Sequence, residues 1–325
     1  MPAPPAAQPP LLARRLSPAT YRRITLFAAW ALGFIILTGG LVRITGSGLG
    51  CPDWPTCAQH QVVAPWHYHA MVEFGNRVVT GAVSLAVILA VLGALIRQPR
   101  RRDLTLLSGG LVAGVLAQIV LGGETVKHQL APPFVMGHFL LSMLLLWDAV
   151  VLHRRAGRPD GGDTVALVSG QQVTMARLCA VAGGFVVFLG TVVTSTGPHG
   201  GDPKAKRLAY SLHDVARLHG TAVWLFLALT VATLWSLVRS AAPARVLRRG
   251  QLLVALIVAQ GGVGYAQYFS GVPAWLVGIH LAGAAAVWAA VIWFNCGLVE
   301  GRPATSAAST GPLATATEAL PALTA

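Results

Sequence analysis

Eight long apolar segments limit what this chain can fold into more than any other feature of its sequence. Each is long enough to cross a hydrocarbon layer of about 30 Å at about 1.5 Å per helical residue. A membrane barrel would instead show short segments of alternating polarity. The predicted spans are 24–42, 78–96, 104–122, 134–152, 177–195, 215–238, 250–268 and 274–296. The sequence therefore predicts an all-α membrane protein with eight transmembrane helices.

The net charge of +13 comes mainly from arginines on one side of the predicted bundle. They lie before the first span, between the second and third, after the fourth, and between the sixth and seventh. The positive-inside rule then places both termini in the cytoplasm and loop 43–77 on the outer face of the cell membrane. The basic excess is a topology signal with some attraction to membrane lipid, and it does not indicate nucleic-acid binding.

The composition of the chain divides it into two halves with tails. Residues 1–20 and 301–325 are of low complexity and are predicted to be disordered. Between them we predict an N-terminal four-helix half at 21–155, a cytoplasmic linker at 156–173 and a C-terminal four-helix half at 174–300. The first span is too long for the apolar part of a cleavable signal peptide, so we expect none.

A repeat relates the two halves. AQIVLGGETVKHQLAPPFVMGH ends at His138 and AQGGVGYAQYFSGVPAWLVGIH ends at His280, and both pass through a glycine-rich helix end and a turn with proline. Gln118 precedes His138 by 20 residues, as Gln260 precedes His280. Because each half has an even number of helices, the halves are predicted to be parallel repeats about an axis along the membrane normal.

The repeat brings together one residue from the second helix of each half and one from the fourth. In the C-terminal half these are His219 and His280, and in the N-terminal half they are Asn76 and His138. Imidazole is a common ligand of haem iron, and facing helices of a bundle are a usual haem site. We predict a haem between His219 and His280, and His138 as a second iron ligand. The alternative is that these histidines only pack and form hydrogen bonds.

Glu73 lies three residues before Asn76, on the same helical face. A carboxylate beside a haem could accept a proton or position a water. The alternative is a solvated surface pair with Arg77 at i+4. Arg43, Arg77 and Arg217 lie at outer helix ends, where they could contact haem propionates or extend to the lipid headgroups.

The segment CPDWPTC holds the only cysteine pair in an outer loop, Cys51 and Cys57. Cys179 and Cys296 lie near the inner ends of their spans. Disulfides persist in oxidising compartments, so we predict a bridge between Cys51 and Cys57. Two free thiols, or a zinc site with nearby histidines, are the alternatives, although the spacing fits no standard zinc finger.

Several stretches together resemble the haem A synthase family. They are TGGLVRITGSGLGCPDWPTC, EFGNR, the segment from GGETV to APPFVMGH, TSTGPHGGD, and the pair RLHG and GIH. The resemblance covers about residues 21–297. It implies that the C8 methyl of haem O is oxidised to a formyl group by successive hydroxylations and loss of water, with haem b as cofactor.

The resemblance also implies roles for individual residues. His219 and His280 match the axial ligands of haem b, and His138 matches the ligand of the substrate haem. Glu73 matches the family's glutamate near that site, and the pair Cys51–Cys57 matches its outer-loop cysteines. A haem O synthase and the cytochrome oxidase assembly machinery are the partners it implies.

One position departs from the family pattern. Many members have a histidine three residues after the glutamate, where this chain has Asn76. The substrate haem is then either five-coordinate on His138 or takes a loop histidine, His67 or His69. We expect the former, because an open coordination position suits oxidation chemistry.

Two other functional classes compete with the enzyme. A di-haem b cytochrome that transfers electrons without modifying haem explains the histidines, but not EFGNR or the cysteine loop. A transporter would place ionisable groups near the membrane centre, whereas here they lie near the outer ends. The sequence leaves open the electron acceptor and the oligomeric state, including a homo-oligomer.

Overall fold

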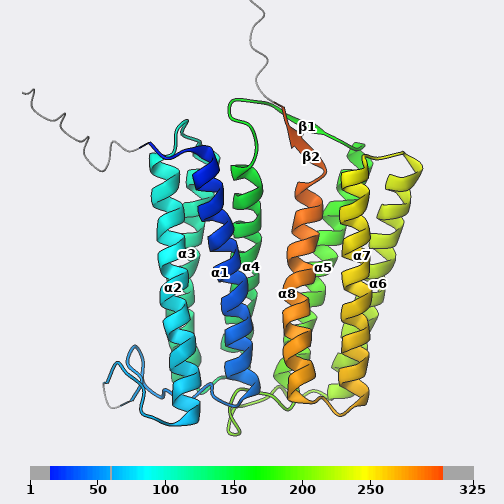
Figure 1. Ribbon diagram of the computed structural model, residues 1–325. Coiled ribbons are helices and arrows are strands. Elements are labelled where there is room, and N and C mark those ends of the chain that lie inside the picture. The colour runs from blue at the N-terminus through cyan, green and yellow to red at the C-terminus, as the bar shows by residue number, and fades with distance from the viewer. Residues whose placement is uncertain (1–14, 59–60, 303–325) are drawn as a thin grey trace, which may run out of the picture.

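A computed structural model describes residues 15–58 and 61–302. Within these residues, eight helices run side by side, and each is long and apolar enough to cross a membrane (Figure 1). They are α1 (Pro18–Ile44), α2 (Tyr68–Ile96), α3 (Arg102–Lys127), α4 (Pro132–Ala156), α5 (Gly170–Thr196), α6 (Leu212–Arg239), α7 (Ala244–Phe269) and α8 (Ala274–Cys296). The prediction of an eight-helix membrane protein is confirmed.

The helices extend beyond the predicted apolar spans because hydrogen bonding continues into the polar boundary of the membrane. The largest difference is in α2, which begins at Tyr68 rather than near residue 78. Local sequence sets some of the ends. Ser17 caps α1 by accepting the Thr20 N–H, and Ser169 forms a reciprocal capping box with Gln172 at the start of α5.

The helices pack as two groups, α1–α4 and α5–α8, which stand beside one another in Figure 1. Each group has its own apolar core. A third cluster joins them through Ile36 of α1, Met143 of α4 and Ala285 of α8. At this seam the Trp288 indole N–H donates to the Met143 carbonyl oxygen at 2.9 Å. The division into two domains and the parallel-repeat relation remain predictions.

Two short strands lie at the end of the bundle where the described residues begin and end, at 15 and 302, which we call the terminus-bearing end (Figure 1). They are β1 (Thr164–Ala166) and β2 (Val299–Gly301), and they pair antiparallel. Three-residue strands have too little alternation to be detected in the sequence. The predicted bounds of the two tails are slightly wrong. Gly301 belongs to β2, and α1 already begins at Pro18.

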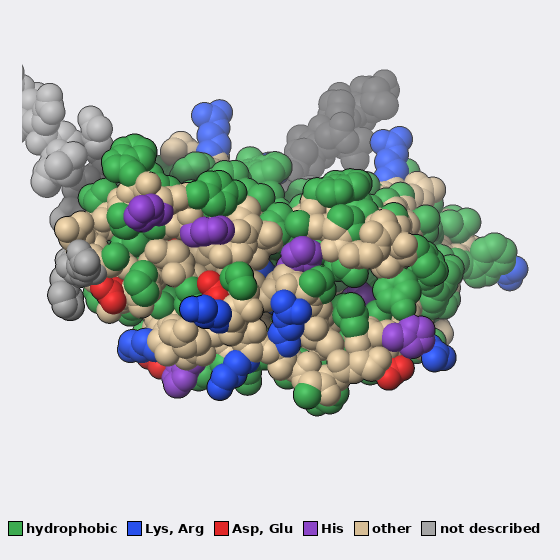
Figure 2. All heavy atoms as spheres, turned by 90° about the horizontal axis from the view of Figure 1, so that it is seen from below, with side chains coloured by type: hydrophobic (Ala, Val, Ile, Leu, Met, Phe, Trp, Pro, Cys, Tyr) green, Lys and Arg blue, Asp and Glu red, His purple; other side chains and the backbone are tan. Residues whose placement is uncertain are grey.

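The opposite end of the bundle, which we call the loop-bearing end, carries the longer connections. Seen from this end, histidine, basic and acidic side chains are spread over one face (Figure 2). The helix flanks expose large apolar side chains, such as those of Trp30, Leu116 and Leu225. Apolar flanks of this kind suit contact with lipid.

A buried ion pair stabilises the terminus-bearing end and yields a testable prediction. Arg97 has no exposed surface, and its Nη2 lies 2.7 Å from Asp160 Oδ1. Removing one partner of such a pair leaves an uncompensated buried charge, so Asp160→Asn should lower the free energy of unfolding by on the order of 3 kcal/mol. Thermal unfolding in detergent measures this.

Asp163→Asn is the matched control, because it makes the same charge change in the same loop on an exposed residue. Equal melting temperatures for the two variants would contradict the assigned role of Asp160.

Candidate functional site

Two buried histidines face one another in the C-terminal group of helices. His219 of α6 and His280 of α8 have ring centroids 6.4 Å apart. The Nδ1 atom of each is buried and forms no hydrogen bond of ordinary length and angle with a described residue, although His219 lies near the backbone of Val186. A metal–imidazole bond is about 2 Å long, so this separation suits two imidazoles on opposite sides of one metal ion. The pair therefore fits a haem iron.

Glycines of neighbouring helices allow these rings to lie deep in the bundle. A methyl group on Gly190 of α5 would lie 3.4 Å from His219 Cε1. One on Gly264 of α7 would lie 3.1 Å from His280 Cε1. Each imidazole is thus held directly against the backbone of the next helix.

His138 of α4 has the same environment in the N-terminal group. A methyl group on Gly122 of α3 would lie 3.4 Å from His138 Cε1, and His138 Nδ1 is likewise buried with no partner in the described part of the chain. Asn76 of α2 does not repeat the role of His219. Its Oδ1 accepts a hydrogen bond from the Thr38 hydroxyl of α1 at 2.8 Å. The N-terminal site therefore has one unpartnered imidazole where the C-terminal site has two.

The sequence repeat is visible as a repeated contact. Gln118 Nε2 donates to the His138 carbonyl oxygen at 2.9 Å, and Gln260 Nε2 donates to the His280 carbonyl oxygen at 2.6 Å. Both contacts join the third helix of a group to its fourth. The spacing of 20 residues in the sequence therefore corresponds to a direct hydrogen bond between the glutamine side chain and the backbone of the histidine, which holds the third and fourth helices in register.

The two loop histidines lie at the start of α2. His67 precedes the helix and His69 is in its first turn, and both are exposed. The Nδ1 atom of His69 is 2.9 Å from the Ser47 hydroxyl. In this arrangement His69 joins the loop to α2.

Glu73 lies in α2 with only 6 % of its surface exposed. Its Oε1 is 2.7 Å from Arg77 Nη2, and its Oε2 accepts the Cys51 N–H at 2.8 Å. The alternative of a solvated surface pair is therefore wrong. Helix α2 begins ten residues before the predicted span, and the loop that follows α1 covers the pair.

Arg77 holds the same loop from the other side. Its guanidinium donates to the carbonyl oxygens of Cys51, Asp53 and Thr56. Charge-assisted hydrogen bonds of this kind are stronger than neutral ones. Together Glu73 and Arg77 attach the loop to α2 through its backbone.

The predicted disulfide between Cys51 and Cys57 is present, and both residues are buried. Bridged cysteines exclude the free-thiol and zinc alternatives. Within the loop, the Trp54 ring lies 5.0 Å from the Arg77 guanidinium carbon. A methyl group on Gly123 of α3 would lie 2.6 Å from Trp54 Nε1. The loop therefore packs on α3 one residue from Gly122, the glycine that contacts His138.

The other two arginines differ in their surroundings. Arg43 donates to the carbonyl oxygens of Thr194 and His199, at 2.9 and 2.8 Å, and so joins α1 to the loop after α5. Arg217 is exposed and its side chain has no hydrogen bond among the described residues. The sequence did not indicate that Arg43 bridges the two helix groups, because its acceptors are backbone atoms far along the chain.

A family model of cytochrome oxidase assembly proteins matches residues 22–67 and 63–292. The chain belongs to this COX15-CtaA family. The match covers both helix groups and every candidate residue discussed above. The resemblance seen in the motifs is confirmed.

Curated relatives of this family carry the name heme A synthase. One from Exiguobacterium sibiricum is 28 % identical over 42 % of this chain and 49 % of the relative. One from Geobacillus kaustophilus is 34 % identical over 34 % and 35 %, and one from Shewanella oneidensis is 31 % identical over 40 % and 44 %. The chain thus aligns with about half or less of each relative's length.

The contacts of Glu73 give a testable prediction about the loop. Glu73→Ala removes the acceptor of the Cys51 N–H and the partner of Arg77, and each charge-assisted hydrogen bond contributes about 1.5–3 kcal/mol. The loop should open more often, so a water-soluble phosphine should reduce the Cys51–Cys57 bridge at least about tenfold faster. Mass spectrometry after thiol alkylation follows the rate.

Glu124→Ala is the control, because among the described residues this acid at the end of α3 pairs only with the exposed Lys127 and His128. A reduction rate unchanged by Glu73→Ala would show that the carboxylate does not hold the loop.

Proposed function

We propose that this protein is a membrane haem A synthase that oxidises the C8 methyl of haem O to a formyl group by successive hydroxylations. The observation that carries the proposal is the unequal pair of imidazole sites, one with two facing histidines and one with His138 alone. Membership of the family and the names of its curated relatives support it.

The facing pair is proposed to hold a haem b cofactor, with His219 and His280 as axial ligands. Haem b would supply one-electron transfer when bound. Two protein ligands close both faces of an iron, which suits electron transfer better than substrate exchange. Gly190 and Gly264 would keep the two imidazoles in place by direct contact.

His138 is proposed to bind the substrate haem on one side, with Asn76 facing the other. Asn76 Oδ1 is engaged by Thr38, so it would leave a coordination position open. Glu73 is proposed as the catalytic carboxylate of this site, accepting a proton or positioning a water. The same carboxylate would also connect the proposed site to the disulfide loop, because its two oxygens contact the Cys51 N–H and Arg77.

Propionate binding is proposed for the arginines at the loop-bearing end. Arg217 is exposed and without a hydrogen bond from its side chain in the described residues, so it is the most available of them. Arg43 and Arg77 already donate to carbonyl oxygens and would have to share these donors.

The proposed location is the cell membrane, with both termini cytoplasmic and the Cys51–Cys57 loop on the outer face. The distribution of arginines supports this orientation. A haem O synthase would supply the substrate, and cytochrome oxidase assembly would use the product. The competing function is a di-haem b cytochrome, which would account for the facing pair His219 and His280 but not for the site with His138 alone.

Analysis of the bound haems tests the proposed reaction. The protein is expressed with a source of haem O and purified in detergent, and its haems are extracted and separated with mass detection. We expect haem A or its hydroxylated precursor beside haem b. Haem b alone, despite available haem O, would favour the electron-transfer cytochrome.

Substitution of the paired histidines tests the cofactor site. His219→Ala or His280→Ala removes an iron ligand. Loss of a residue that only supports a ligand lowers metal affinity about 10–100-fold, so loss of the ligand itself should lower the affinity for haem b by more than this. The haem-to-protein ratio after purification measures this. His213→Ala is the control, because this α6 histidine instead contacts the Tyr268 hydroxyl at 2.7 Å. Normal haem b content in either variant would contradict the assignment.

A further inference from the structure

Several arginines at the terminus-bearing end form no salt bridge with an acid among the described residues, and four of these lie close together. Arg22 lies in α1, Arg154 in α4, Arg158 in the following loop and Arg249 in α7, so the cluster spans both helix groups. The ion-paired arginines of the same end are Arg97, Arg101, Arg155 and Arg245. The basic excess that sets topology is therefore neutralised in part, but not at these four positions.

Arg154 is at the centre of this unpaired arginine cluster. It lies within electrostatic range of Arg22, Arg158 and Arg249. Its guanidinium carbon is 4.5 Å from the centroid of the Trp293 ring, and that of Arg249 is 5.3 Å from the same ring. The Nε atom of Arg154 is buried and has no hydrogen-bond partner in the described part of the chain. A buried donor without a partner points to a missing acceptor.

Glycines at two helix ends leave room for the cluster. Gly157 ends α4, and a methyl group there would lie 3.0 Å from Arg22 Nε. Gly297 ends α8, and a methyl group there would overlap the Arg249 guanidinium. The two helix carboxyl ends contribute about half a negative charge each, which offsets only about one of four positive charges.

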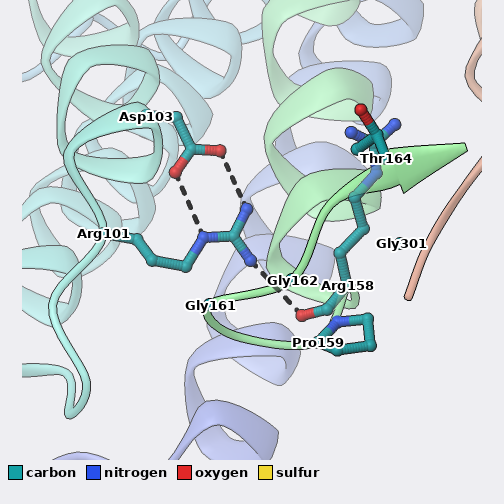
Figure 3. A pocket seen from close by; sticks show the side chains of 8 residues that line it. All are labelled: Arg101, Asp103, Arg158, Pro159, Gly161, Gly162, Thr164 and Gly301. Atoms are coloured by element: carbon teal, nitrogen blue, oxygen red, sulfur yellow. Dashed lines mark hydrogen bonds and ion pairs between the residues drawn. The ribbon is translucent and has the colours of Figure 1, made fainter. Parts of the chain in front are cut away.

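A cavity of about 280 Å³ adjoins the cluster, since Arg158 also lines it (Figure 3). Arg101 and Asp103 form two mutual hydrogen bonds in the lining, while the Arg158 side chain runs toward Thr164 and away from that pair. The remaining lining is mostly loop backbone between residues 159 and 162. The cavity can accept a polar group attached to an anion held by the arginines.

We propose that Arg22, Arg154, Arg158 and Arg249 bind the phosphate of an anionic glycerophospholipid across the seam between the helix groups. Guanidinium groups match phosphate oxygens in geometry and charge, and basic pockets between transmembrane helices are typical sites for lipid headgroups. The headgroup enters the cavity and the acyl chains lie along the apolar helix flanks. The proposal is independent of the haem chemistry, and the proposed orientation puts the lipid in the cytoplasmic leaflet.

Native mass spectrometry and thermal shifts with added phosphatidylglycerol test the site, with phosphatidylcholine as the neutral lipid. The wild-type protein should bind phosphatidylglycerol in preference to phosphatidylcholine. Each arginine near a charged headgroup contributes about fivefold in affinity, so Arg154→Gln with Arg249→Gln should weaken phosphatidylglycerol binding about 30-fold. If the double variant does not fold, Arg249→Gln alone should weaken it about fivefold.

The matched control is Arg239→Gln with Arg245→Gln, which removes two charges at the same end of the bundle. Arg245 is already paired with Glu300, and Arg239 lies over a single ring, that of Trp235. An equal loss of affinity in the control would overturn the proposal, because it would indicate diffuse surface attraction. Equal binding of both lipids by the wild type, or displacement of the lipid by millimolar inorganic phosphate, would also overturn it.

Discussion

Backbone amides inside a hydrocarbon layer must find hydrogen-bond partners within the chain, and this requirement makes the protein a set of helices. The helices must then pack through their side chains without help from water. Here that packing repeatedly sets a large side chain against a glycine of the next helix. His138, His219 and His280 all lie in such positions. The packing that closes the bundle therefore also buries three imidazoles whose Nδ1 atoms form no hydrogen bond of ordinary geometry with the described residues.

The repeated sequence motif makes the same contact in both helix groups, and one residue difference separates their histidine sites. Gln118 and Gln260 make the same bond to the carbonyl oxygen of a histidine in the fourth helix of each group. The second helix contributes His219 in one group and Asn76 in the other. One helix group thus has two facing imidazoles, and the other has a single imidazole and an amide whose oxygen is already hydrogen-bonded to Thr38.

Charge is used differently at the two ends of the molecule. At the loop-bearing end, Arg43 and Arg77 donate hydrogen bonds to backbone carbonyl oxygens and so fix the connections around the N-terminal site. At the terminus-bearing end, Arg97 forms an ion pair with Asp160, whereas the arginines of the unpaired cluster form no ion pair with the described residues. Arginines with similar sequence surroundings therefore have different roles, according to which acceptors the fold brings to them.

The sequence by itself determined the eight spans, because apolar length is a local property. It also indicated the Cys51–Cys57 bridge from six-residue spacing and outer position, and the histidines at the candidate haem sites from their repeat. Only the tertiary structure decided that Glu73 is buried beside Arg77, that Trp54 packs on Gly123 and that β1 pairs with β2. These contacts join residues whose meeting depends on helix order, rotation and the path of a loop. Helix order, helix rotation and loop path depend on packing between distant segments, so no local sequence pattern predicts them.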